Sequence, residues 1–241
     1  MPSGGEWLID KSRPLNAMEL EQLDRDLADF GAASRGGTTS PTLAMSLHDV
    51  TIHNNRSWFS GADIRLDAIV VTGYGKPDDP SSYYMPKTIR FSRVKDGATL
   101  DIGGGGLLVF FGQAAHFLTL AITVSRDRKD IDDLAVLLTE KLRSKETRDA
   151  ISPMLGLAMA APTVAIITAA LDAASTLGEI AYRALQVATG GDTIGIFRNS
   201  HLRVRDGFGL GLQPGPGRQP YRVQDFSFRY EISEEEPVHP G

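Results

Sequence analysis

The 241-residue sequence contains no cysteine. Disulfide bonds, thiolate zinc sites and cysteine nucleophiles are therefore excluded together. The N-terminus also lacks the basic start and apolar core of a secretory signal, so we expect a cytoplasmic protein, with peripheral attachment to a membrane as a further option.

Motifs for catalysis are missing as well. The sequence has no Gly-x-Ser-x-Gly elbow, and neither of its glycine-rich stretches, 103–106 and 207–217, leads into a Lys-Ser or Lys-Thr pair that opens a helix. His48 and His53 are separated by an odd number of residues, so on a regular strand they would face opposite sides and could not share a metal. We therefore expect that the protein is not an enzyme. A hydrolase of unknown substrate ranks third, after the two binding hypotheses given at the end of this section.

The charge and composition restrict the class of partner. The formal net charge is −5 and the pI is near 5.5, which argues against a nucleic-acid partner because nucleic-acid-binding domains are normally basic. Hydrophobic residues make up 41% of the chain, which is enough for an ordinary globular core. The open partner classes are thus a membrane lipid, another protein chain and a second copy of this chain.

An apolar residue at every second position marks most of the chain as strands. The pattern begins at Leu43–Ile52, continues at Ile64–Val70 and His201–Arg205, and closes at Arg222–Ile232. It predicts a mainly β chain with added helices, built on an antiparallel β-sandwich over residues 41–130 and 192–233 and followed by an acidic tail at 234–241. We expect the first two strands to be neighbours in one sheet, and Lys95, Asp96 and Gly97 to form the turn of a hairpin.

Two segments break the β pattern. Residues 1–40 contain a predicted amphipathic helix at Asn16–Phe30, capped by Asn16 and Glu19 and followed by a polar linker. This helix is either packed on the main body or a handle for a partner. Residues 131–191 form an inserted helical subdomain whose apolar stretch, from Met154 to Leu171, predicts a helical hairpin split near Pro162.

Three destinations are open for the apolar hairpin. It could pack on the sandwich or another subunit, insert into a membrane, or line a ligand pocket. About eighteen uncharged residues approach the length needed to span a bilayer, but Ala, Thr, Gly and Pro supply little transfer free energy. The candidate membrane-binding or partner-binding residues are Met154, Leu155, Leu157, Val164, Ile166, Ile167 and Leu171.

An acidic loop is the best candidate for a metal site. Asp127, Asp130, Asp132 and Asp133 lie close together in sequence, and such carboxylates repel one another unless they are solvated, paired with cations or bound to a hard metal such as calcium. Pairing with the basic neighbours Arg126, Arg128 and Lys129 is the alternative to a metal.

Three short motifs resemble the C2 domain, the calcium-binding and phospholipid-binding β-sandwich. Gly61, Ala62 and Asp63 resemble its first loop, Ser125 and Asp127 occupy its Asp-x-Asp positions, and Asp192, Ile194 and Gly195 resemble its closing motif. The resemblance implies a C2-like fold with possible calcium ligands at Asp63, Asp127 and Asp192, and Asp130 of the acidic loop is the fourth candidate ligand. Because Ser57 and Ser125 stand at two positions where the family has aspartate, it also implies weak calcium binding or none.

Together these patterns predict a non-catalytic binding module. The first hypothesis is a module directed by its inserted apolar helices to a membrane surface or a protein assembly. The alternative is a structural or oligomerisation protein with no lipid role, in which the acidic loop is a solvated turn. The two differ in where the apolar helix face is buried.

Overall fold

The computed structural model describes residues 40–57, 61–75, 79–127, 164–189 and 192–235, together with residues 134, 136 and 138. The predicted helix at Asn16–Phe30, the stretch at 139–163 and the end of the acidic tail lie outside these residues. Within them, ten strands form two antiparallel sheets, and one long helix packs on the second sheet.

Sheet A has six strands arranged around the first and last strands of the fold. β1 (Thr42–Ile52) lies between β10 (Phe226–Glu235) on one side and β4 (Ala98–Thr99) and β5 (Leu107–Gln113) on the other. β8 (Gly211–Gln213) and β9 (Tyr221–Val223) pair with β10. The sheet therefore joins residues from the two ends of the described chain.

Sheet B has four long strands in the order β3-β2-β6-β7. They are β2 (Ala62–Thr72), β3 (Tyr84–Val94), β6 (Phe117–Arg126) and β7 (Thr193–Leu202). Three short helical turns complete the described elements: η1 (Pro80–Tyr83), α5 (Arg203–Asp206) and η2 (Gly207–Gly209).

The main core lies between the two sheets. Period-2 alternation turns Leu43, Met45 and Leu47 of β1 toward sheet B, whose β2 contributes Ile64 and Leu66. β10, which pairs with β1, adds three aromatic side chains and one aliphatic side chain to the same core: Phe226, Phe228, Tyr230 and Ile232. All these side chains are fully buried, so the sandwich rests on an ordinary hydrophobic core.

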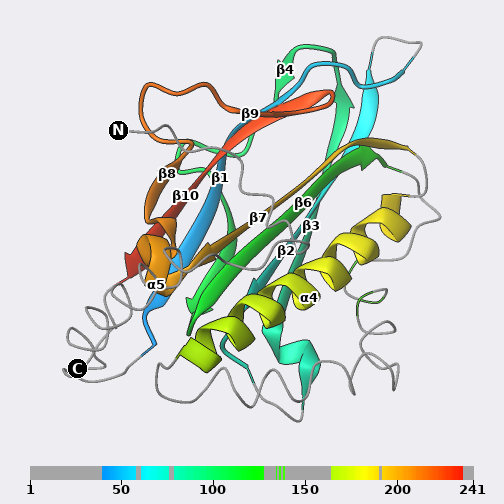
Figure 1. Cartoon of the computed structure of the whole chain (residues 1–241). Coiled ribbons are helices and arrows are strands. Elements are labelled where there is room, and N and C mark those ends of the chain that lie inside the picture. Colours follow the sequence, from blue (N-terminus) through cyan, green and yellow to red (C-terminus); the bar gives the residue numbers. More distant parts are fainter. Residues whose placement is uncertain are drawn as a thin grey trace, which may run out of the picture.

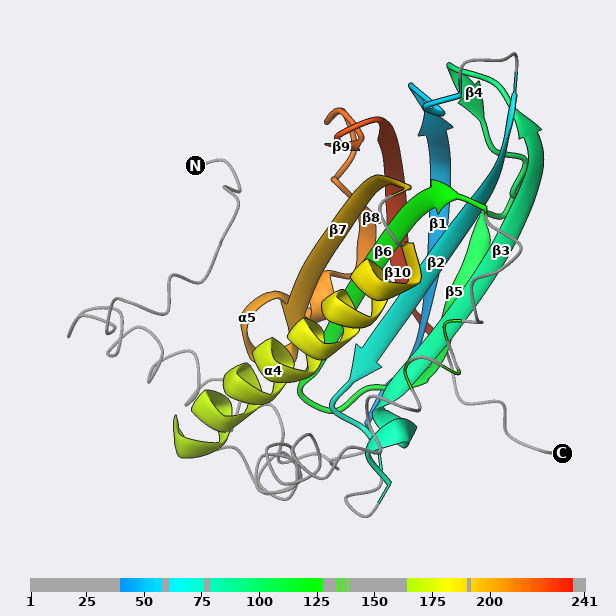
Figure 2. The same cartoon turned by 90° about the vertical axis from the view of Figure 1, so that its right-hand side faces the viewer.

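The helix α4 (Val164–Thr189) lies along sheet B, on the side away from sheet A (Figures 1 and 2). Its second half buries one face, which consists of Ala174, Leu177, Ala181, Ala184, Leu185 and Ala188. Small residues on that face allow a close approach: a Cβ added to Gly178 would lie 3.2 Å from the Thr119 side chain of β6. The residues that the structure describes thus form three layers, sheet A, sheet B and α4.

The structure confirms a mainly antiparallel, β-sandwich-like chain with an added helix, and it corrects three details. β1 and β2 are not neighbours, because β1 belongs to sheet A and β2 to sheet B. The turn at Lys95–Gly97 does not close a hairpin, since β3 pairs with β2 while β4 pairs with β1. Residues 203–205, expected to extend a strand from His201, form part of α5.

Candidate functional site

Three of the four predicted calcium ligands lie at one end of sheet B. Asp63 is at the start of β2, Asp127 follows the end of β6, and Asp192 precedes β7. The backbone N–H of Asp127 donates to the carbonyl of Asp63 at 2.8 Å, and that of Arg126 donates to the carbonyl of Asp192 at 3.1 Å. The motifs that resemble C2 loops are therefore neighbours in the fold. We call this the loop end, formed by residues 53–57, 61–63, 93–98, 126–127, 192–193 and 224–225.

The carboxylates at the loop end have partners within the protein. Asp63 Oδ1 accepts a hydrogen bond from the backbone N–H of Arg93 at 3.0 Å, and Asp127 forms an ion pair with Arg90 at 3.3 Å. The described residues contain no group of three or more His, Cys, Asp or Glu side chains that could hold a metal ion. Asp130 lies outside them, so the calcium site remains a prediction.

Hydrogen bonds hold the loops at this end against one another. The buried Asn55 donates its side-chain N–H to the carbonyl of Val94 at 2.8 Å, and its backbone N–H to Asp96 Oδ1 at 2.6 Å. Arg56 forms an ion pair with Asp225 at 2.8 Å and donates to the carbonyl of Thr193. Sheet A and sheet B are thereby linked through their connecting loops.

Basic side chains remain on the surface of the loop end. Arg93, Lys95 and Arg126 are exposed, and none of them forms an ion pair with another residue in the described ranges. The alternative to a metal site was pairing of the loop aspartates with their basic neighbours Arg126, Arg128 and Lys129. Of that loop the structure describes Arg126 and Asp127, and Asp127 forms its ion pair with Arg90. Asp63 and Asp96 are also exposed there, so the loop end presents accessible groups of both signs.

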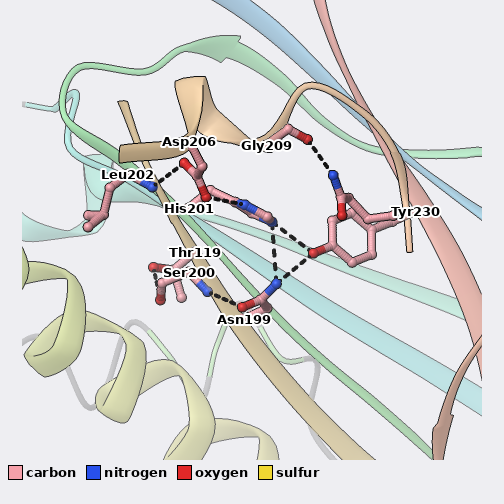
Figure 3. A network of polar contacts seen from close by, with 9 residues as sticks. Thr119, Asn199, Ser200, His201, Leu202, Asp206, Gly209 and Tyr230 are labelled. Carbon is pink, nitrogen blue, oxygen red and sulfur yellow. Dashed lines mark hydrogen bonds and ion pairs between the residues drawn. The ribbon is translucent and has the colours of Figure 1, made fainter. Parts of the chain in front are cut away.

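A second polar cluster lies near the opposite end of β7, close to α5 (Figure 3). His201 Nδ1 lies 3.0 Å from Asp206 Oδ2, and its Nε2 lies 2.8 Å from the Tyr230 hydroxyl. Because a carboxylate only accepts, Nδ1 carries the ring proton and Nε2 accepts from Tyr230. Asn199 completes the chain by donating its side-chain N–H to the Tyr230 oxygen at 2.8 Å.

This cluster joins elements rather than presenting a reactive group. His201 is 6% exposed and Tyr230 is fully buried among Phe197, Tyr221 and Phe228. Burial raises the pKa of the Tyr230 hydroxyl, and the neighbouring Tyr221 raises it further, so the phenolate is strongly disfavoured. The scattered histidines gave no sequence signal for it, since its members come from three separate elements.

A buried ion pair lies between sheet B and the helical layer. Arg65 Nε is 2.7 Å from Asp67 Oδ2 on β2, and both side chains are 0% exposed. Thr88 of β3 donates to the other carboxylate oxygen of Asp67. Burial raises the pKa of the Asp67 carboxyl by more than Thr88 and Arg65 lower it. The pair was missed in the sequence because Arg65 and Asp67 alternate with apolar residues as the exposed face of a strand does.

The predicted membrane-binding or partner-binding residues are only partly placed. Val164, Ile166, Ile167 and Leu171 belong to the first half of α4, whose backbone alone is described, and Met154, Leu155 and Leu157 lie outside the described residues. The described half of α4 packs on sheet B. No helix in the described ranges combines the length and apolarity needed to cross a membrane.

Comparison of the chain with protein-family models, curated proteins and solved structures gives no match.

Proposed function

We propose that this chain is a non-catalytic binding module that docks its loop end on an anionic membrane surface. The observation that carries the proposal is the exposure of Arg93, Lys95 and Arg126 at one end of the molecule, where none of them forms an ion pair with another described residue and Asp127 is paired with Arg90. A rigid set of loops with accessible cations suits a surface of lipid phosphates.

The C2-like reading of the fold supports the same end of the molecule. In that family the loops at one end of the sandwich meet the lipid, and Asp63, Asp127 and Asp192 lie together at such an end here. In this proposal the aspartates shape the loops, and calcium binds weakly or not at all because two of the carboxylates already have partners.

The expected affinity is low. Each Lys or Arg near an anionic leaflet contributes about 1 kcal/mol, so three exposed cations supply roughly 3 kcal/mol. Such binding decreases as salt screens the charges. The described half of α4 is buried on sheet B, so the proposal assigns membrane contact to the loop end and gives that half of the helix a structural role.

Co-sedimentation with vesicles of phosphatidylserine and phosphatidylcholine tests the proposal. We expect binding at low salt that decreases at high salt, is equal with calcium or chelator, and is lost in Lys95→Glu/Arg126→Glu. The control Arg183→Glu/Arg218→Glu makes the same charge change at two exposed residues outside the loop end and should bind as the wild-type chain does. A chain that stays in the supernatant with anionic vesicles at low salt contradicts the proposal.

A second candidate function is assembly, favoured by exposed apolar side chains on sheet A. Phe111 is 60% exposed and Leu108 is 44% exposed, both on β5. Light scattering decides this candidate: a defined oligomer that Phe111→Ser dissociates, together with no vesicle binding, would support it. The described residues provide no observation in favour of the hydrolase hypothesis, and we do not propose it.

A further inference from the structure

The outer face of sheet A carries an apolar patch on β5. Phe110 pairs with Met45 and points into the core, so the next pair, Phe111 and Ala44, points outward. Leu108 pairs with Ser46 and lies on the same outer side. We call Leu108 and Phe111, with Ala44 beside them, the sheet A patch. Among the described residues Phe111 is the most exposed large hydrophobic side chain, and α4 covers sheet B instead.

The patch lies where the N-terminal part of the chain joins the fold. β1 begins at Thr42, which pairs with Gln113 of β5, and Ala44 is two residues further on. Residues 31–41 separate the predicted helix from β1 and can span up to about 36 Å when extended. That is about the length of an eleven-residue strand such as β1, so the helix can reach any part of the outer face of sheet A.

The segment at Asn16–Phe30 has an apolar side that suits this surface. Leu20, Leu23, Leu27 and Phe30 follow one another at spacings of three, four and three residues, which places them on one face of a helix about 22 Å long. The opposite side carries Glu21, Arg25 and Asp29. A helix of fifteen residues is marginal by itself in water and is stabilised by packing its apolar face.

We infer that residues 16–30 dock as a helix on the sheet A patch, with Leu20, Leu23, Leu27 and Phe30 covering Leu108 and Phe111. A short tether makes the encounter intramolecular, at an effective concentration of about millimolar, which favours this segment over a partner free in solution. Docking adds a fourth layer and removes the exposed apolar surface from water. The inference concerns the face of sheet A and does not depend on the proposed function at the loop end.

Cysteine labelling of the full-length chain tests the docking, because the sequence has no cysteine of its own. A single Leu108→Cys reporter is treated with a maleimide in three backgrounds. The first is otherwise wild type, and the second carries Leu23→Glu/Leu27→Glu on the apolar side of the helix. The third is the matched control Gln22→Glu/Ala28→Glu, which adds the same charge on the polar side. Val187→Cys, 53% exposed on α4, serves as a reporter away from sheet A.

We expect the second background to label Leu108→Cys about tenfold faster than the first, the control to match the first, and Val187→Cys to be unchanged throughout. Equal rates at Leu108→Cys in all three backgrounds would overturn the inference. Protection that increases with protein concentration would also overturn it, since the occupant would then be a second copy of the chain. Circular dichroism of each variant shows that the sandwich is folded.

Discussion

At the scale of residues, the most consequential finding is a buried charge pair that an ordinary strand pattern concealed. Arg65 and Asp67 are paired, and their burial follows from the helical layer that covers sheet B. A buried pair of this kind contributes little net stability, because removal of both charges from water is unfavourable. Removal of one of the two charges is nevertheless severe, because the other charge stays buried and loses this ion pair.

The raised pKa of Asp67 gives a prediction about pH. Between the unfolded pKa of about 3.9 and the higher folded value, the folded state binds more protons than the unfolded state. The contribution of the Asp67 carboxyl to the free energy of unfolding therefore decreases as pH rises through this window. The side chain of Asp67→Asn cannot titrate, so the variant serves as the reference. The difference between the unfolding free energies of the wild type and the variant should fall with increasing pH, by at most about 1.4 kcal/mol per pH unit.

Denaturant unfolding at a series of pH values from 4 to 7 measures this difference. The variant removes the Asp67 carboxylate that pairs with Arg65 and should be less stable, so the slope with pH is the informative quantity. A difference that increases with pH would show that Arg65 and Thr88 prevail over burial and lower the pKa of Asp67.

At the scale of elements, the pattern of apolar residues identified where the strands lie but did not identify which strands pair with each other. The expected strands at Leu43–Ile52 and Ile64–Val70 correspond to β1 and β2, yet these pair in different sheets. Alternation reports which face of a strand is buried, and a sandwich has two buried faces that look alike. The turn at Lys95–Gly97 was misassigned for the same reason, because a tight turn can also connect one sheet to the other.

At the candidate site, the fold places three of the predicted ligands close together, and calcium binding there stays a prediction. The resemblance of Asp63, Asp127 and Asp192 to one family's loops brought together residues that the fold also places together. Nothing in their local sequence indicated that Arg90 and the backbone of Arg93 would engage two of the carboxylates. Those contacts come from β3, whose position depends on the sheet topology.

The close approach of α4 to sheet B predicts a sensitive position at Gly178. A leucine there would meet Thr119 and push the helix outward, and overpacking of this kind outweighs the gain in helix propensity. We expect Gly178→Leu to lower the unfolding free energy by about 1–2 kcal/mol. The control Gln186→Leu, at an exposed position of the same helix, should change it by less than about 0.5 kcal/mol. Denaturant titration compares them, and equal effects would contradict the close packing.

At the scale of the whole molecule, stability depends on the last strand. β10 pairs with β1, β8 and β9 and buries four large side chains, each worth roughly 1.5–3 kcal/mol. Their sum is comparable with the total stability of about 5–15 kcal/mol that single domains have. Deletion of residues 226–241 should therefore abolish cooperative thermal unfolding, whereas deletion of 236–241 alone should preserve it. A cooperative transition in the longer deletion would show that sheet B and α4 form a domain by themselves.

The pairing of β1 with β10 also sets an order of events during synthesis. Phe226 follows its partner Ile52 by 174 residues, and a ribosome adds about 5–20 residues per second. The apolar strand β1 thus leaves the ribosome roughly 9–35 s before the strand that completes its sheet. In that interval its hydrogen-bonding edge is open to other nascent chains, so the yield of native protein should depend on the rate of translation and on chaperones that shield unpaired strands.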